Sequence, residues 1–272
     1  MALEVQVLTG RKGSNPGGIC NIIVNPYRII PCYVKYCPGS HLPRGSNLGA
    51  RNQPVYEAVT NELVRRVGLA TPRTHVLIDT DKDVRFIKLD GAREGLGEGR
   101  RYYFVSELVT TKQSKNQELL KEVRDREEPY LDILGICDVF NISNNYFFYE
   151  DKTGKIVYID LGCSFVRAKE GWIEIKNRDR REMGSRDNLK RARKELANYS
   201  IVPAQGGSPI SLFSLVEDIP NIELSTLNPD KRMAVTGVLS PAEITEIQTI
   251  LTVEIDRGLK KYRRNPHIII RN

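Results

Sequence analysis

A glycine-rich turn between short apolar strands is the feature that most narrows the folds open to this chain. Residues 3–8 alternate as a half-buried strand does, and the apolar run at 21–24 is typical of a second strand. The turn GRKGSNPGG, at 10–18, separates the two. A third strand, predicted at 29–36, carries Lys35 among apolar residues. Because burying an unpaired ammonium group is costly, we expect this lysine to have a partner.

The segment after these strands changes to a helical pattern. Apolar residues recur at steps of three and four over 54–67, and Gly68 is a natural end for the helix. Glu62 lies on this helix. A strand lysine held by a helix carboxylate can reach phosphate oxygens, which the N–H groups of a glycine turn also approach. Lys35 with Glu62 is therefore a candidate phosphate site; alternatively, Lys35 points outward from an edge strand and Glu62 lies on a solvated face.

Further strands are predicted at 75–78 and 85–88, as a hairpin, and at 102–109. The middle of the chain is then helical over about 114–138. Pro129 falls inside this segment, and we expect it to mark a break or a helix start, since a proline in mid-helix costs about 3 kcal/mol. The first part of the chain is thus rich in strands and the next part is helical.

Oxygen-bearing side chains gather around a second predicted hairpin, with strands at 145–149 and 156–161 and Gly154 in the turn. Asp160 ends the second strand, and five polar residues precede the first: Asp138, Asn141, Ser143, Asn144 and Asn145. Such oxygens suit Mg²⁺, although Asn and Asp at these junctions also form turns. The joint order of glycine turn, strand lysine, helix glutamate and strand-end aspartate favours a site, because chance rarely supplies the ordered set.

With these features in this order, the chain resembles the HipA-like kinases, relatives of the phosphatidylinositol kinases within the protein-kinase-like fold. The resemblance runs from about Thr9 to Phe165 and rests on GSNPGGICNIIV, YVKY, NELVRRVGLATPRTHVLI, YYFVSELV and YFFYEDKTGKIVYIDLGCSF. It implies an α+β, bilobal fold with a strand-rich lobe at 1–109 and a mainly helical lobe at 110–272. The last helix is predicted to begin with a capping box of Ser240 and Glu243.

The resemblance also implies ATP and Mg²⁺ as cofactors, and phosphoryl transfer to a hydroxyl, most readily a Ser or Thr of a protein substrate. The nucleotide would be held by the glycine turn, the lysine–glutamate pair and the backbone of a hinge-like strand: Gly13, Ser14, Gly17, Gly18, Lys35, Glu62, Ser106, Glu107 and Leu108. Asp160 would bind the metal, with Asn144 or Asn145 as the second ligand.

The catalytic loop departs from the family pattern of an aspartate, a histidine two residues later and an asparagine five residues later. Counted from Asp138, these positions hold Phe140 and Ser143. Asp138 is our candidate for the catalytic base, and a purely structural role for it is the alternative. In another alignment Asn141 or Ser143 takes the place of the aspartate and no base is left. A second hypothesis is therefore a pseudokinase that binds nucleotide or acts as a scaffold.

The net charge of +7, from 41 Lys and Arg against 34 Asp and Glu, is concentrated outside this site. Residues 176–198 hold nine basic and four acidic residues. A third hypothesis is that the basic segment 176–194 binds nucleic acid or an acidic partner. Its interleaved acids and lack of aromatic residues favour a solvated helix face instead.

The remaining composition argues against a membrane or secreted protein. No run approaches about 20 apolar residues, and the opening residues lack the apolar core of a signal peptide. Five scattered cysteines are typical of buried thiols in a reducing cytoplasm. Cys32, Cys37 and His41 are not expected to bind a metal, because the two cysteines flank an alternating strand and no second ligand pair follows.

Overall fold

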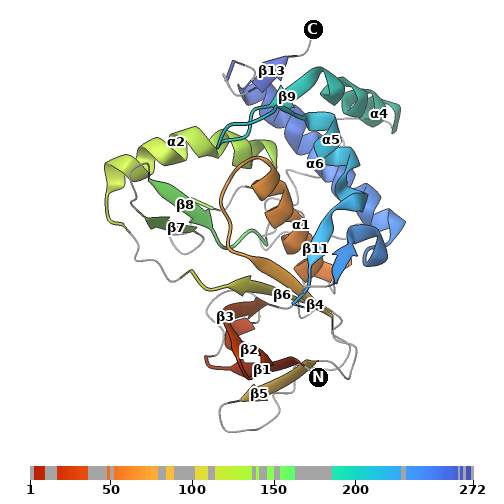
Figure 1. Cartoon of the computed structure of the whole chain (residues 1–272). Helices are drawn as coiled ribbons and strands as arrows, with labels where there is room; N and C mark the ends of the chain where they lie inside the picture. The colour runs from red at the N-terminus through yellow and green to blue at the C-terminus, as the bar shows by residue number, and fades with distance from the viewer. Residues whose placement is uncertain are drawn as a thin grey trace.

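In a computed structural model of the chain, a strand-rich N-terminal part is followed by a mainly helical C-terminal part (Figure 1). The α+β class expected from the sequence is therefore confirmed. The structure describes residues 3–9, 17–35, 48–49, 52–78, 84–88, 102–109, 114–136, 139–140, 146–149, 154–162, 186–227, 231–262, 264–265 and 268–270.

The larger sheet has six strands in the order β4-β6-β3-β2-β1-β5. Its first five members form an antiparallel run: β4 (Thr74–Ile78), β6 (Tyr102–Glu107), β3 (Arg28–Lys35), β2 (Gly17–Asn25) and β1 (Leu3–Val7). The last strand, β5 (Val84–Lys88), pairs in parallel with β1. The predicted hairpin of 75–78 with 85–88 is therefore wrong. Instead β4 pairs with β6, because both strands are buried along nearly their whole length.

Helix α1 (Gln53–Arg66) matches the helix predicted at 54–67, and eleven of its 14 residues are buried. Proline at the start of the helix fits there because the N–H it lacks would have no helical partner. Gly68 follows the helix with a φ of +82°, and a Cβ at this position would lie 2.7 Å from the backbone nitrogen of Ala204. Glycine thus ends α1 for reasons of both conformation and space.

Helix α2 (Gln117–Ile133) begins at Asn116, whose side chain accepts a hydrogen bond from the backbone N–H of Leu119. Pro129 lies inside α2, so the predicted break or start at this residue is wrong. The residues that follow the proline, Tyr130, Leu131 and Ile133, are almost fully buried. Burying each large apolar side chain contributes about 1.5–3 kcal/mol, which together exceeds the cost of one proline.

The hairpin that follows is confirmed: β7 (Tyr146–Tyr149) pairs in antiparallel fashion with β8 (Lys155–Tyr158), and Gly154 in the turn has a φ of +68°. The C-terminal part then contains α4 (Arg186–Glu195), β9 (Tyr199–Ile201), β10 (Ile210–Ser211), α5 (Leu212–Glu217), β11 (Glu223–Ser225), β12 (Arg232–Ala234), α6 (Pro241–Tyr262) and β13 (Ile268–Ile270). Among the described helices, none is long and apolar enough to cross a membrane.

The predicted capping box at the start of α6 is present. The side-chain oxygen of Ser240 accepts a hydrogen bond from the backbone N–H of Glu243, and the Glu243 carboxylate accepts from the backbone N–H of Ser240. Each side chain thereby satisfies an N–H group that the first turn of the helix leaves without a helical partner.

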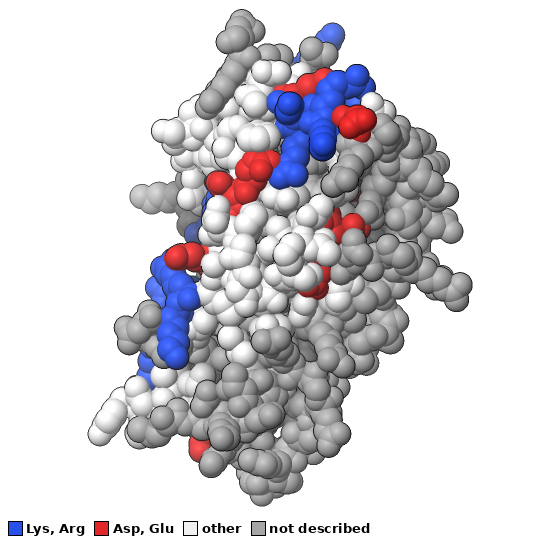
Figure 2. All heavy atoms as spheres, turned by 90° about the vertical axis from the view of Figure 1, so that its right-hand side faces the viewer, with Lys and Arg blue, Asp and Glu red and all other residues white. Residues whose placement is uncertain are grey.

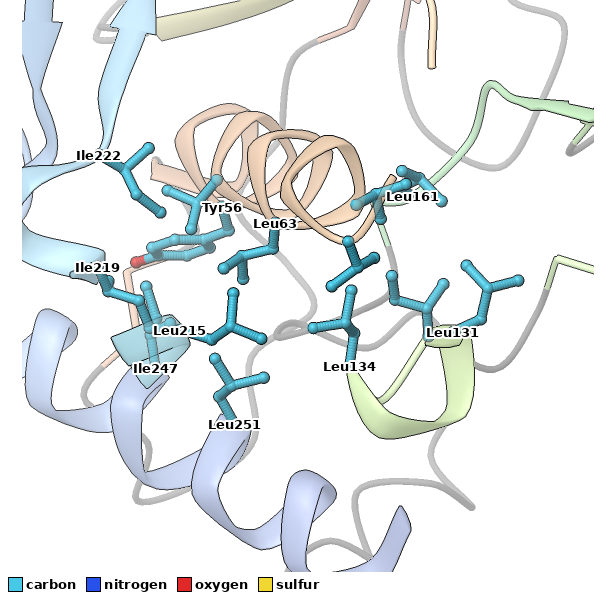
Figure 3. Packing of buried hydrophobic residues seen from close by; sticks show 14 of the residues in the cluster. Tyr56, Leu63, Leu131, Leu134, Leu161, Leu215, Ile219, Ile222, Ile247 and Leu251 are labelled. Atoms are coloured by element: carbon cyan, nitrogen blue, oxygen red, sulfur yellow. The ribbon is translucent and has the colours of Figure 1, made fainter. Parts of the chain in front are cut away.

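Two apolar clusters hold the described residues together. The smaller covers one face of the large sheet and includes Val5, Ile22 and Tyr103. The larger surrounds α1 and joins it to α2, α5, α6 and the opposite face of β4 and β6. Figure 3 shows Leu131 and Leu134 below the right-hand end of α1, and Leu215, Ile247 and Leu251 of α5 and α6 below its left-hand end. Helix α1 therefore belongs to the core of the C-terminal part while it contacts the sheet.

Candidate functional site

Three charged side chains from distant parts of the chain meet at the end of β3. The ammonium nitrogen of Lys35 lies 2.7 Å from Oε1 of Glu57 on α1 and 2.8 Å from Oδ1 of Asp160, just after β8. Lys35 and Glu57 are buried, with 8% and 2% of their surfaces exposed. The Asp160 side chain is 41% exposed. The site therefore has an interior ion pair and one carboxylate that a ligand from solvent can reach.

The sheet and α1 position these groups. Lys35 pairs with Phe104 across β3 and β6, and its ammonium group lies 5.7 Å from the centre of the Phe104 ring. Phe104 belongs to the face of the sheet that packs against α1, so the lysine points toward the helix. A Cβ at Gly162 would lie 2.8 Å from a carboxylate oxygen of Glu57. Glycine at this position therefore allows the chain that carries Asp160 to pass close to Glu57.

The three groups differ in how they hold their protons. Burial acts to lower the pKa of Lys35, but the two carboxylates outweigh it and hold that pKa above its usual value. Burial acts to raise the pKa of Asp160, but Lys35 outweighs it and the net pKa is lowered. For Glu57, burial dominates and raises the pKa to about 7, although Lys35 opposes the change. Near neutral pH, Lys35 and Asp160 are charged and Glu57 is close to its titration midpoint.

The expected pairing of Lys35 with Glu62 is wrong. Glu62 instead contacts the guanidinium group of Arg65. Residues 57 and 62 are five positions apart, which separates their side chains by roughly 140° around an α-helix. Since Glu57 faces Lys35, Glu62 must face elsewhere. Because α1 is buried on nearly all sides, its apolar pattern does not identify one inner face, and the sequence does not predict which glutamate faces Lys35.

The glycine turn ends opposite the lysine. Gly17 pairs with Lys35 across β2 and β3, and Gly18 pairs with Val34. A Cβ at Gly17 would lie 2.2 Å from the carbonyl oxygen of Val34, so only glycine fits there. Gly13 and Ser14, also predicted to bind nucleotide, lie outside the described residues. The end of the turn thus reaches the strand position of Lys35, as a phosphate-binding role requires.

The hinge-like residues Ser106, Glu107 and Leu108 lie at the end of β6. The backbone N–H of Glu107 donates to the carbonyl oxygen of Arg73 at 2.9 Å, and that of Leu108 donates to Pro31 at 3.0 Å. These two N–H groups are thus engaged within the protein. A base bound beside them would therefore use other backbone groups, such as carbonyl oxygens.

The predicted catalytic loop lies outside the described residues, including Asp138 with its alternatives Asn141 and Ser143, and both candidate second metal ligands, Asn144 and Asn145. In the part of the chain that is described, no group of three or more His, Cys, Asp or Glu could hold a metal. Asp160 remains suitable as one ligand, because it is partly exposed and a carboxylate can accept contacts beyond its bond to Lys35.

Two of the five cysteines lie among the described residues. Cys20 and Cys32 are buried in β2 and β3, and their thiols contact the carbonyl oxygens of Gly18 and Cys20 at 3.5 Å. Burial, followed by the neighbouring Cys20, raises the pKa of the Cys32 thiol far above its usual value. These two cysteines are thus buried thiols, as expected from the sequence, and their burial makes them poor nucleophiles. Cys37 and His41 lie outside the described residues.

The basic segment 176–194 is described only from residue 186, where it forms α4. Figure 2 shows Lys and Arg side chains gathered at the top of the face drawn there, where Figure 1 places α4. Lys190, Arg191 and Lys194 are exposed, whereas Arg193 contacts Glu217 of α5. The helix is consistent with a solvated face and with a surface for an anionic partner.

Comparisons with known proteins find similarity to solved structures alone. No family model matches the chain, and no curated protein matches it in sequence. Among solved structures it is similar to a proinflammatory kinase of Helicobacter pylori, CtkA, with 12% identity over 96% of this chain and 99% of that chain. The TM-score is 0.41. A similarity this limited does not assign an activity to the chain.

Proposed function

We propose that the protein is a Mg²⁺- and ATP-dependent phosphotransferase, specifically a HipA-like kinase that acts in the cytoplasm on a Ser or Thr of a protein substrate. The observation that carries the proposal is the position of Lys35 between the buried Glu57 and the exposed Asp160. The resemblance to HipA-like kinases predicts a lysine, a helix glutamate and a strand-end aspartate at one point.

Each group has a defined role in this chemistry. Lys35 stays charged and binds phosphate oxygens, so it neutralises negative charge as the phosphoryl group transfers. Glu57 holds the lysine in place from α1. Gly17 and Gly18 bring backbone N–H groups near the phosphates. Asp160 would hold Mg²⁺, which supplies further positive charge to the phosphates.

The identity of the catalytic base separates two forms of the proposal. With Asp138 as the base, an acceptor hydroxyl loses its proton to that carboxylate as its oxygen bonds to the γ-phosphorus of ATP, and the bond to the β–γ bridging oxygen breaks to release ADP. Without a base, the same site would bind nucleotide and act as a pseudokinase scaffold. The Lys35–Glu57–Asp160 cluster supports nucleotide binding in both forms, so transfer itself must be measured.

The test compares Lys35→Met and Asp160→Asn with the exposed control variants Lys121→Met and Asp125→Asn, in assays of nucleotide binding and of autophosphorylation with labelled ATP. Lys35→Met should keep the fold, because Glu57 can take up a proton when its cation is removed. We expect both site variants to lose ATP turnover and both controls to retain it. Full turnover in both site variants would disprove the assignment. Nucleotide binding by the wild-type protein without transfer would establish the pseudokinase form.

A further inference from the structure

Besides their apolar packing, helices α1 and α6 are joined by hydrogen bonds to one carboxylate, that of Glu243. Its Oε1 accepts hydrogen bonds from the Tyr56 hydroxyl, from the Asn52 amide at 2.8 Å and from the Gly49 backbone at 3.1 Å. Its Oε2 accepts from the backbone N–H and the hydroxyl of Ser240, at 2.9 and 2.8 Å. One oxygen therefore holds the start of α1, and the other caps α6.

This contact is a strong one because the carboxylate is buried and remains ionised. Only 7% of the surface of Glu243 is exposed. Burial acts to raise its pKa, but the hydrogen bond from Tyr56 and those from Ser240 and Asn52 outweigh burial and lower it. Burial and Glu243 raise the pKa of Tyr56, so the phenol keeps its proton and donates it. Hydrogen bonds to a charged acceptor are roughly twice as strong as those between neutral groups.

The same turn of α1 faces both Glu243 and the candidate site. Tyr56 and Glu57 are consecutive, so their side chains point about 100° apart around the helix. Figure 3 shows the Tyr56 ring directed from α1 toward Ile219 and Ile247, whereas Glu57 contacts Lys35. A rotation or slide of α1 that separated Glu57 from Lys35 would also pull Tyr56 from Glu243.

The other end of the helix is also attached to the C-terminal part. The carbonyl oxygen of Val67 accepts from the backbone N–H of Ala204, and that of Ala70 accepts from Tyr158, both at 2.9 Å. With its C-terminal end fixed in this way, the orientation of α1 depends on what holds its first turns. Glu243 supplies the hydrogen bonds at that end, and the larger apolar cluster packs around it.

We propose that Glu243 is a positioning residue for the Lys35 site: acting through Tyr56, it fixes α1 so that Glu57 remains on Lys35 in the free protein. Its consequence for catalysis rests on the proposed function, but the coupling itself is a property of Lys35 and can be measured without any ATP assay. The C-terminal helix α6 thus determines the state of a site to which it contributes no residue.

The test uses two variants, each of which removes one of the two contacts of Glu243: the contact with α1 or the capping box of α6. Tyr56→Phe removes the hydroxyl that holds α1 and leaves the capping box of α6 intact. Ser240→Ala, the matched control, weakens the capping box and leaves the contact with Tyr56. The control should lower the midpoint of thermal unfolding by about 2–4 °C. The readout is the rate at which a water-soluble amine-reactive ester acylates Lys35 in the full chain, measured by mass spectrometry.

We expect Tyr56→Phe to accelerate acylation of Lys35 several-fold, because an α1 that Glu243 no longer holds withdraws Glu57 and leaves the lysine amine open to the ester. Ser240→Ala should leave that rate unchanged despite its lower thermal stability. Glu243→Gln, which retains a capping residue at the same position, should give an intermediate rate. Equal rates in Tyr56→Phe and the wild type would overturn the proposal, as would equal acceleration in Tyr56→Phe and Ser240→Ala.

A parallel assay of ATP turnover separates this proposal from the proposed function. If the protein is a kinase, Tyr56→Phe should lower kcat more than it raises KM for ATP, because the mispositioned lysine stabilises the transferring group less well. Ser240→Ala should retain wild-type turnover. A wild-type protein that transfers no phosphate would refute the kinase, whereas the acylation rates would still decide the role of Glu243.

Discussion

The raised pKa of Glu57 leads to a prediction whose sign is opposite to that of an ordinary surface ion pair. A carboxylate beside a lysine usually has a lowered pKa, so that the pair stabilises the fold as the pH rises. Here burial outweighs Lys35 and raises the pKa of Glu57 from 4.5 to about 7. The folded protein therefore holds a proton that the unfolded chain releases, and ionisation of Glu57 destabilises the fold.

The size of the effect follows from the interval between the two pKa values. Each pH unit between 4.5 and about 7 is worth about 1.4 kcal/mol, so the free energy of unfolding should fall by about 3 kcal/mol across it. The loss begins as the pH rises above the unfolded value and is complete above the folded one. Lys35 and Asp160 titrate outside this window, since their pKa values are shifted upward and downward from 10.5 and 3.8.

The assay is urea denaturation of the wild type and Glu57→Gln at several pH values between 5 and 8. The amide cannot ionise, so the difference between the two proteins isolates Glu57 from every other titrating group. We expect Glu57→Gln to gain stability relative to the wild type as the pH rises, with the difference levelling off above about pH 7. A difference that is flat, or that changes in favour of the wild type, would refute the dominance of burial at this site.

Three further outcomes are expected. Gly17→Ala should lower the free energy of unfolding by about 1–3 kcal/mol, because its Cβ would overlap a carbonyl oxygen of β3. Gly237→Ala is the control: nothing lies within 4 Å of its Cβ, so the free energy of unfolding should change little. Glu62→Gln should leave ATP turnover within about twofold of the wild type, since Glu62 contacts Arg65 outside the site. A loss of turnover as large as that expected of Lys35→Met would contradict the assigned pairing. If the basic segment binds nucleic acid, its affinity should fall steeply between low and moderate salt. The affinity should also decrease when three exposed side chains of α4, Lys190, Arg191 and Lys194, are replaced by Gln. Binding that does not depend on salt would exclude this role.

Local chemistry made several elements predictable from the sequence. Gly68 and Gly154 have the left-handed backbone conformations that end α1 and turn the β7–β8 hairpin, and few other residues adopt them. Ser240 and Glu243 identify the start of α6, because a capping box needs only residues three positions apart. Such features depend on residues that are close in the sequence, so they can be predicted without knowledge of the fold.

The errors all concern contacts with distant residues. β4 pairs with β6 instead of β5, and that choice depends on which strands share a buried sheet. Pro129 is tolerated because the core gains more from the residues after it than the helix loses. Lys35 and Asp160 were expected in one candidate site, and the structure brings the two side chains into contact. The choice of Glu57 over Glu62 required the orientation of a helix buried on nearly all sides.

The embedding of α1 in the larger apolar cluster bears on how the chain could be divided. The resemblance places a lobe boundary at residue 109, yet α1 shares one apolar cluster with residues on both sides of that boundary. A fragment of residues 1–109 would therefore expose the helix that carries Glu57, and a fragment of residues 110–272 would lack the centre of its own core. Neither fragment should be soluble alone. The site of Lys35, Glu57 and Asp160 should therefore form from two fragments only when both are expressed in the same cell.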